Sequence, residues 1–378
     1  MAAAVQKFNR LRSCIHLFHN NGSFRAGLYQ VRGFANTTES IAISYSDFGD
    51  PRKVLRKEFS PLPKKLASSQ ILVKMMMAPI NPSDINMIEG TYHIRPTLPS
   101  LVGNEGVGEV IDVGSGVKNL KKGDWVLPAH AAWGTWRTHA VCEEATVQQI
   151  DNDISVLGAA TIAVNPCTAY RMLKDFVPVK QGDIVIQNGA NSSVGQSVIQ
   201  LAKEWGISTI NIIRNRPDCD QLVSYLKHLG ATYVMTEEYA SSREMRDFIA
   251  SLPKPPVLAF NCVGGKSATE LTRFLGQNGI MVTYGGMSKK PVVVPTGAFI
   301  FKEIRLAGYW NTQWNTQNSH SVEKVTMYKD LCKLMRTGKL LTPESDLIPF
   351  EKFEDAVAQA MEGFRKEKKV LVMDEKYL

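Results

Sequence analysis

The chain has 378 residues, 44% of them hydrophobic and 21% charged, which is typical of a packed globular protein and excludes a largely disordered one. The length is enough for two domains of ordinary size, and no apolar run approaches the roughly 18 residues of a membrane span. The six cysteines include no CxxC pair. This spacing argues against a structural zinc lobe and a secreted disulfide scaffold, so we expect scattered reduced thiols that act as small apolar fillers.

The first 38 residues carry much of the net charge of +8. They hold five basic residues and no acidic one, and apolar residues recur there at steps of three and four. A basic amphipathic start without acids is typical of a mitochondrial transit peptide, which we predict over residues 1–35; the alternative is a disordered arm. Subtracting these five charges from +8 leaves +3. That ordinary surface charge gives no support to nucleic-acid binding.

The chain from about residue 40 to 165 is rich in strand-like runs broken by glycine and proline. "ILVKMMMAPINPSD" is a β run that ends in turn residues, and "GVGEVIDVGSGV" and "KKGDWVLPAH" continue in the same style. We therefore predict a compact, mainly β domain over residues 36–165. After residue 310, helices over 321–337 and 351–363 and a final strand "KKVLVM" are expected to return to it, so the domain includes residues 311–378.

From residue 166 to 310 short apolar strands alternate with helical segments. "DIVIQN" (183–188), "TINII" (209–213), "TYVMT", "PVLAFN" and "GIMVTYGG" are the strands, and one intervening helix is expected to end at Gly230. Alternation of this kind predicts right-handed βαβ units and a parallel sheet. The fold class is thus α/β, with a Rossmann-type parallel-sheet domain beside a mainly β domain.

A small-residue turn, "GANSSVG", joins the first of these strands to a helix. It keeps only Gly189, Ala190 and Gly195 of a glycine-rich dinucleotide motif. Small residues let a pyrophosphate approach the backbone, and the helix N-terminus offers N–H groups and a partial positive charge. The strand before the turn and the helix after it strengthen the prediction of a dinucleotide site.

Two arginines, Arg214 and Arg216, follow the next strand, where an NAD site usually places an acidic residue for the ribose hydroxyl. Two guanidinium groups there would bind a 2′-phosphate, so we predict NADPH as the cofactor. The alternatives are that both are solvated surface charges or that one points away. A later strand ends in "VTYGGM" with Tyr284, Gly285 and Gly286, either as a cofactor contact or as an ordinary turn.

The stretch "GNEGVGEV" (103–110) has Asn104 where zinc-dependent dehydrogenases have a metal-binding histidine in a similar Gly-His-Glu sequence. A catalytic zinc needs about three ligands from Cys, His, Asp or Glu. The cysteine of the predicted β domain, Cys142, lies near its end, and the spacing of His93, His130 and His139 is not typical of a set of zinc ligands. We therefore predict no metal, and a donor other than zinc must then supply the proton or stabilise negative charge.

Tyr92, in "GTYHIRPTLPS", is the candidate donor. A tyrosine hydroxyl, with an ordinary pKa of about 10, is acidic enough to protonate a developing enolate. From spacing alone, Tyr92 is one tyrosine among 11, which favours a packed or interfacial tyrosine. His93 is a rival donor, or a solvated loop residue.

The segments "NPSDINMIEGTYHIRPTLPSLVGNEGVGEV", "NPCTAYRML", "VIQNGANSSVGQSVIQ", "NIIRNRPD" and "VTYGGM" closely resemble the mitochondrial trans-2-enoyl-thioester reductases. These are zinc-free members of the medium-chain dehydrogenase/reductase superfamily, with a GroES-like catalytic domain and a Rossmann domain. The resemblance covers about residues 40–373. It implies Tyr92 as the proton donor, and cofactor contacts at Asn165, Asn191, Ser192, Ser193, Val194, Arg214, Asn215, Arg216, Tyr284, Gly285, Gly286, Met287, Tyr309, Trp310, Asn311 and Lys368.

The resemblance also implies what the protein does and with which partners. It implies NADPH-dependent reduction of a 2-enoyl group on acyl carrier protein or coenzyme A, in mitochondrial fatty acid synthesis in the matrix, by a homodimer. Hydride would reach the β carbon and Tyr92 would protonate the α carbon, directly or through water. Two rivals stay open: a quinone reductase of the same superfamily, and a cofactor-binding protein with little catalysis.

Overall fold

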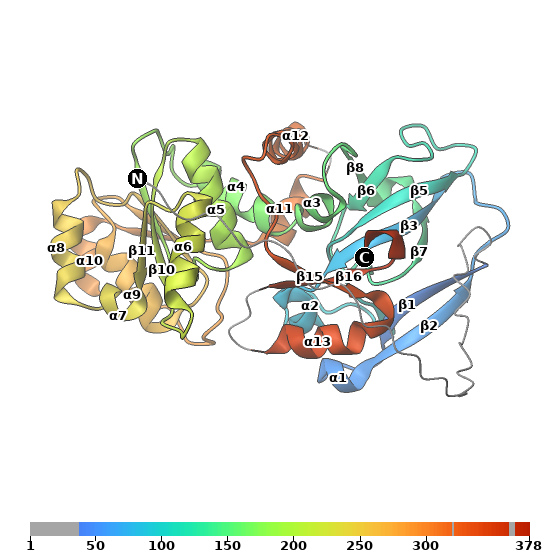
Figure 1. The fold of residues 1–378 in the computed structure, drawn as a ribbon, viewed down its shortest axis with the longest axis horizontal. Coiled ribbons are helices and arrows are strands. Elements are labelled where there is room, and N and C mark those ends of the chain that lie inside the picture. Colours follow the sequence, from blue (N-terminus) through green and yellow to red (C-terminus); the bar gives the residue numbers. More distant parts are fainter. Residues whose placement is uncertain (1–37, 320, 363–366) are drawn as a thin grey trace, which may run out of the picture. The chain divides into compact units, whose positions relative to one another are not determined.

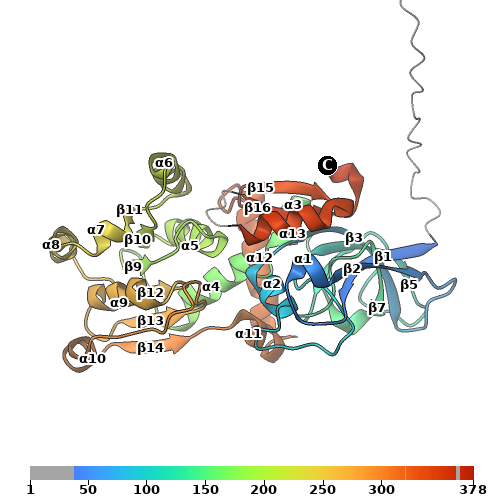
Figure 2. The same cartoon turned by 90° about the horizontal axis from the view of Figure 1, so that it is seen from below.

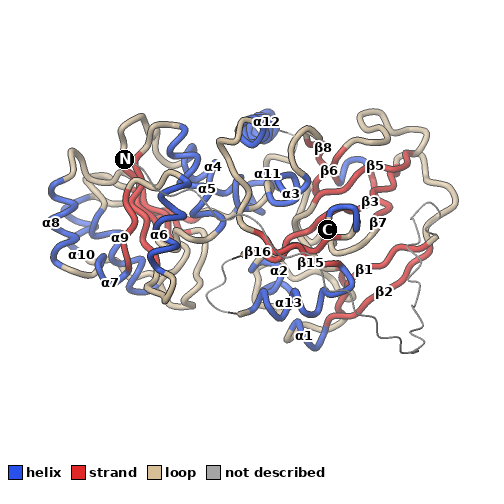
Figure 3. Tube along the Cα trace, in the orientation of Figure 1, coloured by secondary structure: helices blue, strands red, loops and turns tan. Residues whose placement is uncertain are grey.

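The computed structural model describes residues 38–319, 321–362 and 367–378, and residues 38–378 form one compact unit. The predicted transit peptide lies outside the described residues. Three sheets organise the described chain (Figures 1 and 3). Within those ranges, no helix has both the length and the apolar composition that crossing a membrane requires.

A seven-stranded sheet and a three-stranded sheet form the mainly β part, as the sequence indicated. The central strand β3 (Gln70–Pro79) pairs antiparallel with β5 (Val107–Val113), β7 (His139–Glu143) and β16 (Lys368–Val372). Through its pairing with β3, β16 places the end of the chain against this part. The remaining strands are β6 (Trp125–Pro128), β8 (Val147–Ile150) and β15 (Ser345–Pro349) in the larger sheet, and β1 (Glu39–Tyr45), β2 (Leu55–Pro61) and β4 (Ser100–Leu101) in the smaller one.

A six-stranded parallel sheet forms the predicted Rossmann-type part, in the order β11-β10-β9-β12-β13-β14. Its inner strands are mainly buried because helices cover both faces, and Figure 2 shows α5 on one side and α9 on the other. The strands are β9 (Ile184–Gln187), β10 (Ser208–Ile213), β11 (Tyr233–Thr236), β12 (Leu258–Asn261), β13 (Ile280–Thr283) and β14 (Arg305–Gly308).

The helices begin and end largely where the sequence places their signals. The helix α6 ends at Gly230, whose φ of 113° is the left-handed cap that the sequence predicts. The second predicted C-terminal helix begins two residues late, at Phe353, because a 3₁₀ turn over Phe350–Lys352 precedes it. The helices are α1 (Pro51–Val54), α2 (Pro82–Ile88), α3 (Val156–Thr161), α4 (Asn165–Asp175), α5 (Ser193–Glu204), α6 (Cys219–Leu229), α7 (Glu237–Ala240), α8 (Arg243–Ser251), α9 (Gly265–Phe274), α10 (Thr296–Lys302), α11 (Asn311–Gln317), α12 (Val322–Arg336) and α13 (Phe353–Met361).

The strand order reverses between β9 and β12, the point at which ligands bind outside the carboxyl ends of parallel strands. Buried amides fix these strand ends. Asn188 donates from Nδ2 to Oδ1 of Asn261 across 2.8 Å, and accepts at Oδ1 from the backbone N–H of Cys262 across 2.9 Å. The segments that follow β9 and β12 are therefore held in fixed positions relative to each other.

One apolar core cluster runs from the larger mixed sheet through α4 and α12 to the parallel sheet. It includes Val107, Cys167, Val185 and Leu331, all fully buried. The five cysteines in the described ranges are free, and three of them, Cys167, Cys262 and Cys332, are buried, which agrees with the expected role as small apolar fillers.

Candidate functional site

A cavity of about 720 Å³ lies at the carboxyl ends of the parallel strands and continues to the mainly β part. It collects residues from α2, the segments after β9 and β13, α4, α11 and β16. All predicted site residues line it except Asn215 and Arg216: Tyr92, Asn165, Asn191, Ser192, Ser193, Val194, Arg214, Tyr284, Gly285, Gly286, Met287, Tyr309, Trp310, Asn311 and Lys368.

The turn after β9 forms a close-approach cradle at the N-terminus of α5. Ser192 is the N-cap, and its hydroxyl accepts from the N–H of Gly195 across 3.1 Å. A side chain at Gly195 would place its Cβ 2.5 Å from the carbonyl oxygen of Ala190, so only glycine fits there. Because Asn191, Ser192, Ser193 and Val194 line the cavity, the positive end of the helix faces it, as a pyrophosphate requires.

The two arginines after β10 lie in different surroundings. Arg214 is exposed and lines the cavity. The guanidinium of Arg216 instead forms two hydrogen bonds to the carboxylate of Asp218, at 2.5 and 3.1 Å, and its side chain is 7% exposed. Neither Arg216 nor Asn215 lines the cavity. Arg214 is therefore the residue of this segment that a 2′-phosphate in the cavity would meet.

Two further predicted contacts present buried polar atoms at the cavity. Asn165 begins α4, and its Nδ2 is buried without a hydrogen-bond partner among the described residues. The hydroxyl of Tyr284 lies beside Cys262 and Ser192, and burial raises the pKa of Tyr284 well above its usual value. Tyr284 is thus a neutral phenol. Since an unpaired buried donor is costly, the Asn165 amide is suited to a ligand acceptor.

The candidate proton donor is held against an indole. The Nε1–H of Trp310 donates to the hydroxyl oxygen of Tyr92 across 2.8 Å, and the two rings meet edge to face with centroids 6.3 Å apart. The backbone N–H of Tyr92 donates to the carbonyl of Asn86 at the end of α2, across 3.0 Å. The ring of His93 also meets Trp310 edge to face, at 5.1 Å. Trp310 accordingly orients the hydroxyl of Tyr92, and His93 packs against the ring of Trp310.

Asn104 connects three chain segments. Its backbone N–H and its Nδ2 both donate to Oδ1 of Asp84, at 3.0 and 2.7 Å, and its Oδ1 accepts from the N–H of Ala132 across 2.7 Å. Asp84 is 1% exposed, and burial raises its pKa to about 6. Asn104 thus uses its amide to brace the loops around the cavity.

The neighbouring Glu105 joins the mainly β part to α4. It is fully buried; Oε1 accepts from the N–H of Val164 and Oε2 from Nδ2 of Asn81, both across 2.7 Å. Asn81 in turn accepts at Oδ1 from Nζ of Lys368 across 2.6 Å. Burial raises the pKa of Glu105, and the charge of Lys368 opposes part of that rise. Lys368 is therefore positioned at the cavity by a buried chain of hydrogen bonds.

Metal-ligand side chains do not gather in this part of the molecule. Across residues 38–319, 321–362 and 367–378, no group of three or more His, Cys, Asp and Glu side chains could hold a metal ion. Cys142 lies on β7, and the ring of His139 makes a hydrogen bond of 3.2 Å to the hydroxyl of Thr138. The absence of a catalytic metal stays a prediction, for which Asn104 gives the structural basis.

Sequence reasoning missed several residues that shape the site. Asn81 and Asp84 form a capping box at the start of α2, a signal present in "NPSD". Thr168, Asn315 and Tyr328 line the cavity as well, but they follow no local motif and are brought there by the packing of α4, α11 and α12.

Comparison with known proteins agrees with this geometry. Residues 67–175 match the family model of the alcohol dehydrogenase GroES-like domain, and residues 193–326 match that of the zinc-binding dehydrogenases. The enoyl-[acyl-carrier-protein] reductase, mitochondrial, of Xenopus tropicalis is 48% identical over 91% of this chain and 99% of its own length.

Two solved structures share the fold closely. The complex of Etr1p with NADP and crotonyl-CoA is 37% identical, with a TM-score of 0.83 over 89% of this chain and 100% of its own. The mitochondrial 2-enoyl thioester reductase Etr1p/Etr2p heterodimer from Candida tropicalis is 36% identical, with a TM-score of 0.83 and the same coverage. The chain therefore belongs to the mitochondrial enoyl-[acyl-carrier-protein] reductases, within the medium-chain dehydrogenase/reductase superfamily.

Proposed function

We propose that this protein reduces trans-2-enoyl thioesters of acyl carrier protein or coenzyme A to saturated acyl thioesters, with NADPH as the reductant. One observation carries the proposal: the hydroxyl of Tyr92, oriented by Trp310, lies in the same cavity as the dinucleotide cradle of α5. The solved relative Etr1p, which binds NADP and crotonyl-CoA in its crystal, supports the same cofactor and substrate class.

The residues of the cavity fit this cofactor. Gly195 lets the backbone of Ala190 pack closely against the start of α5, and the N-terminus of α5 attracts the charge of a pyrophosphate. Arg214 lines the cavity after the end of β10 and would bind the 2′-phosphate. The Nδ2 of Asn165, which is buried without a hydrogen-bond partner among the described residues, would donate to an acceptor of the cofactor.

NADPH, when bound, supplies the hydride that the β carbon of the enoyl group accepts. The conjugated thioester draws the resulting negative charge onto its carbonyl oxygen and α carbon. Tyr92 then transfers its hydroxyl proton to the α carbon, directly or through water. The Trp310 N–H occupies a lone pair on the Tyr92 oxygen, which leaves the hydroxyl proton free for the substrate and stabilises the phenolate that remains.

The remaining polar residues act as framework. Asn104, Asp84 and Glu105 hold α2, the loop before Ala132 and α4 in place through buried hydrogen bonds. Their polar atoms are committed to these bonds. The conjugated thioester is already an activated electrophile, so this arrangement needs no zinc to polarise it.

The edge strand β14 offers the surface for a homodimer. It is paired only with β13 within the described chain. Exposed apolar side chains gather on it and on the preceding helix α10: Phe299, Ile300, Phe301 and Leu306. Exposed strand edges with apolar neighbours favour pairing with a second chain, and the Etr1p/Etr2p neighbour is a dimer.

Acyl carrier protein is the second partner, and the mitochondrial matrix is the expected location, since the relatives are named mitochondrial.

The test follows the oxidation of NADPH by absorbance when a trans-2-enoyl-CoA is added to the chain lacking residues 1–35. NADH and a quinone serve as parallel controls. Turnover that requires both NADPH and the enoyl thioester supports the proposal. Turnover with the quinone alone would assign the protein to the quinone reductases, and tight NADPH binding without turnover would indicate a non-catalytic role.

A further inference from the structure

One face of the cofactor helix α5 is attached to the segment 339–344, which lies between α12 and β15. Gln196, Gln200 and Glu204 follow one another at intervals of four residues on α5, so their side chains share a face. At the exposed end of this face, Nζ of Lys339 lies 2.6 Å from Oε2 of Glu204. The segment therefore begins at the C-terminal end of α5, opposite the dinucleotide cradle.

Gln200 makes the buried attachment. Its side chain is 4% exposed; Oε1 accepts from the backbone N–H of Leu341 across 2.7 Å, and Nε2 donates to the carbonyl oxygen of Leu341 across 3.4 Å. Nε2 also donates to the carbonyl oxygen of Gln196 across 3.3 Å. An amide that pairs with both backbone groups of one residue fixes its position and its orientation. Because these bonds are buried, losing one partner leaves polar groups unpaired in the interior, which is costly.

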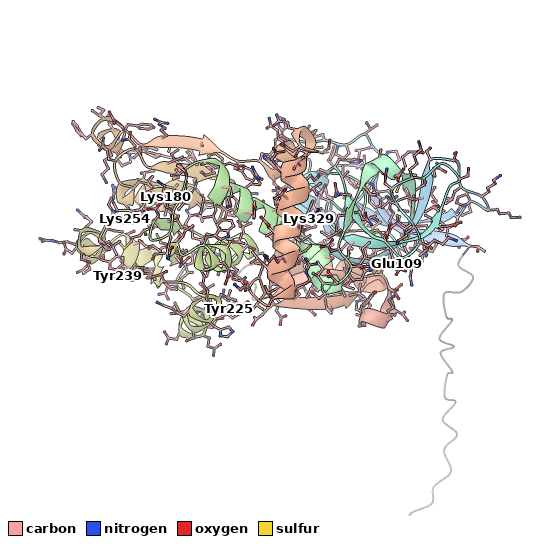
Figure 4. The ribbon with its side chains drawn as sticks, turned by 90° about the horizontal axis from the view of Figure 1, so that it is seen from above. Glu109, Lys180, Tyr225, Tyr239, Lys254 and Lys329 are labelled. Atoms are coloured by element: carbon pink, nitrogen blue, oxygen red, sulfur yellow. The ribbon has the colours of Figure 1, made fainter. Side chains whose placement is uncertain are left out.

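Gln196 connects the same face to the cradle. It is 8% exposed; Nε2 donates to the carbonyl oxygen of Asn191 in the cradle across 2.9 Å, and Oε1 accepts from the hydroxyl of Tyr225 on α6 across 3.2 Å. Figure 4 marks Tyr225. Its phenol also lies beside Glu344, and burial raises the pKa of Tyr225, with the charge of Glu344 adding to the rise. The far end of the segment 339–344 thus meets the cradle through this phenol.

The segment also sets the position of Lys368. The carbonyl oxygen of Glu344 accepts from the backbone N–H of Lys368 across 2.8 Å, and the parallel pairing of β15 with β16 begins at the next residue, Ser345. Pro343, Glu344 and Lys368 all line the catalytic cavity. A shift of the segment along α5 would therefore move one wall of the cavity relative to the cradle.

We propose that Gln200 is a positioning residue for the reaction: it holds the segment 339–344 against α5 and thereby fixes the dinucleotide cradle relative to Lys368. This inference rests on the proposed enoyl reduction, in which a nucleotide on α5 and a thioester beside Tyr92 must be held at one distance. Gln200 does not itself line the cavity, so it acts through Leu341. A misplacement of about 1 Å between reacting groups can lower a rate about 100-fold.

The first test is Gln200→Met, which keeps an unbranched side chain of similar size and removes both hydrogen-bonding atoms. In the chain lacking residues 1–35, we expect kcat for crotonyl-CoA to fall roughly tenfold to 100-fold. The Kd of NADPH, from fluorescence titration, should stay the same, because residues 191–194 and Arg214 are untouched. Glu204→Gln is the matched control on the same face of α5. It should keep both values, since an exposed ion pair contributes little.

The second test needs no turnover. Amide hydrogen exchange, measured without nucleotide by mass spectrometry of peptides that cover residues 339–344 and β16, follows the connection itself. Gln200→Met should speed exchange roughly tenfold in the first peptide, the effect of one lost hydrogen bond, and should also speed it in β16. The second peptide reports whether the change travels from Leu341 to Lys368. Glu204→Gln should leave both rates unchanged.

Three results would overturn the inference: a native kcat in Gln200→Met, a loss of NADPH affinity as large as the loss of kcat, or unchanged exchange in β16. If circular dichroism shows that Gln200→Met does not fold, Gln200→Asn replaces it, since its amide is one methylene too short to reach Leu341, and the same outcomes apply. An unsubstituted chain that binds NADPH but reduces no enoyl thioester would instead refute the proposed function. The exchange rates would then still decide whether Gln200 fixes the segment.

Discussion

The indole N–H of Trp310 donates to the hydroxyl oxygen of Tyr92 across 2.8 Å, although 218 positions separate the two residues in the chain. Tyr92 lies in the loop that follows α2, whereas Trp310 immediately precedes α11. The hydrogen bond thus joins a loop of the mainly β part to the segment that leaves the parallel sheet after β14. The candidate donor is oriented by a residue from the other part of the molecule.

Replacement of Tyr92 by Phe removes the proton donor and keeps the ring. We expect kcat for crotonyl-CoA reduction to fall roughly 100-fold to 10,000-fold, the usual contribution of a positioned general acid. NADPH affinity, measured by fluorescence titration, should stay the same because the cradle of α5 is untouched. A Tyr92→Phe enzyme that turns over at the native rate would remove Tyr92 as the donor.

Replacement of Trp310 by Phe keeps an aromatic ring and removes its N–H. We expect a smaller loss in kcat, roughly twofold to tenfold, the magnitude of one net hydrogen bond. In the Tyr92→Phe background the same change should cost less, because the hydroxyl that Trp310 orients is already gone. Equal losses in both backgrounds would show that Trp310 acts independently of Tyr92.

Replacement of both Arg214 and Arg216 by Ala should weaken NADPH binding far more than NADH binding, since only NADPH carries the 2′-phosphate. The single change Arg214→Ala should account for most of the loss, roughly tenfold or more in Kd, because Arg214 lines the cavity and Arg216 is bonded to Asp218. Titration of both nucleotides to each variant measures this. Equal weakening of the two nucleotides would contradict the phosphate assignment.

The sequence predicts features that depend on neighbouring residues better than contacts between residues far apart in the chain. The cap at Gly230, the cradle from Gly189 to Gly195 and the parallel strands all rest on neighbouring residues, and the structure has them where expected. Contacts between distant residues could not be derived. Lys368 reaches Asn81 over 287 positions, and only the antiparallel pairing of β16 with β3 brings them together.

The sequence also does not predict the direction in which a side chain points. Arg214 and Arg216 stand two positions apart, and their spacing alone does not say which one faces the cavity. The backbone after β10 decides it, together with Asp218, whose carboxylate binds Arg216.

A charge on the edge strand should prevent self-association. We expect Leu306→Glu, at a side chain 42% exposed on β14, to shift a dimer toward the monomer in sedimentation or light scattering at micromolar concentration. Val322→Glu is the matched control, since it places the same charge on an apolar side chain 76% exposed at the start of α12. Dissociation by both variants alike, or by neither, would count against β14 as the interface.

The stability of the enzyme should fall as the pH rises from about 4 to about 6, in part because of Asp84. Burial raises the pKa of this carboxyl from 3.8 to about 6. In that window the folded state therefore binds more protons at this site than the unfolded state. By linkage, Asp84 lowers the free energy of unfolding by at most about 3 kcal/mol as the pH rises through this window. Above the window its contribution is constant.

The variant Asp84→Asn isolates this contribution. It removes the titrating group and also replaces one acceptor oxygen by an NH₂ group, whereas Asp84 accepts from Asn81 on one oxygen and twice from Asn104 on the other. Its free energy of unfolding should therefore be lower at every pH, yet should change less between pH 4 and 6 than that of the unsubstituted protein. Urea unfolding at several pH values measures both quantities. An unchanged slope would show that the Asp84 carboxyl keeps its ordinary pKa in the folded protein, despite its burial beneath Asn104.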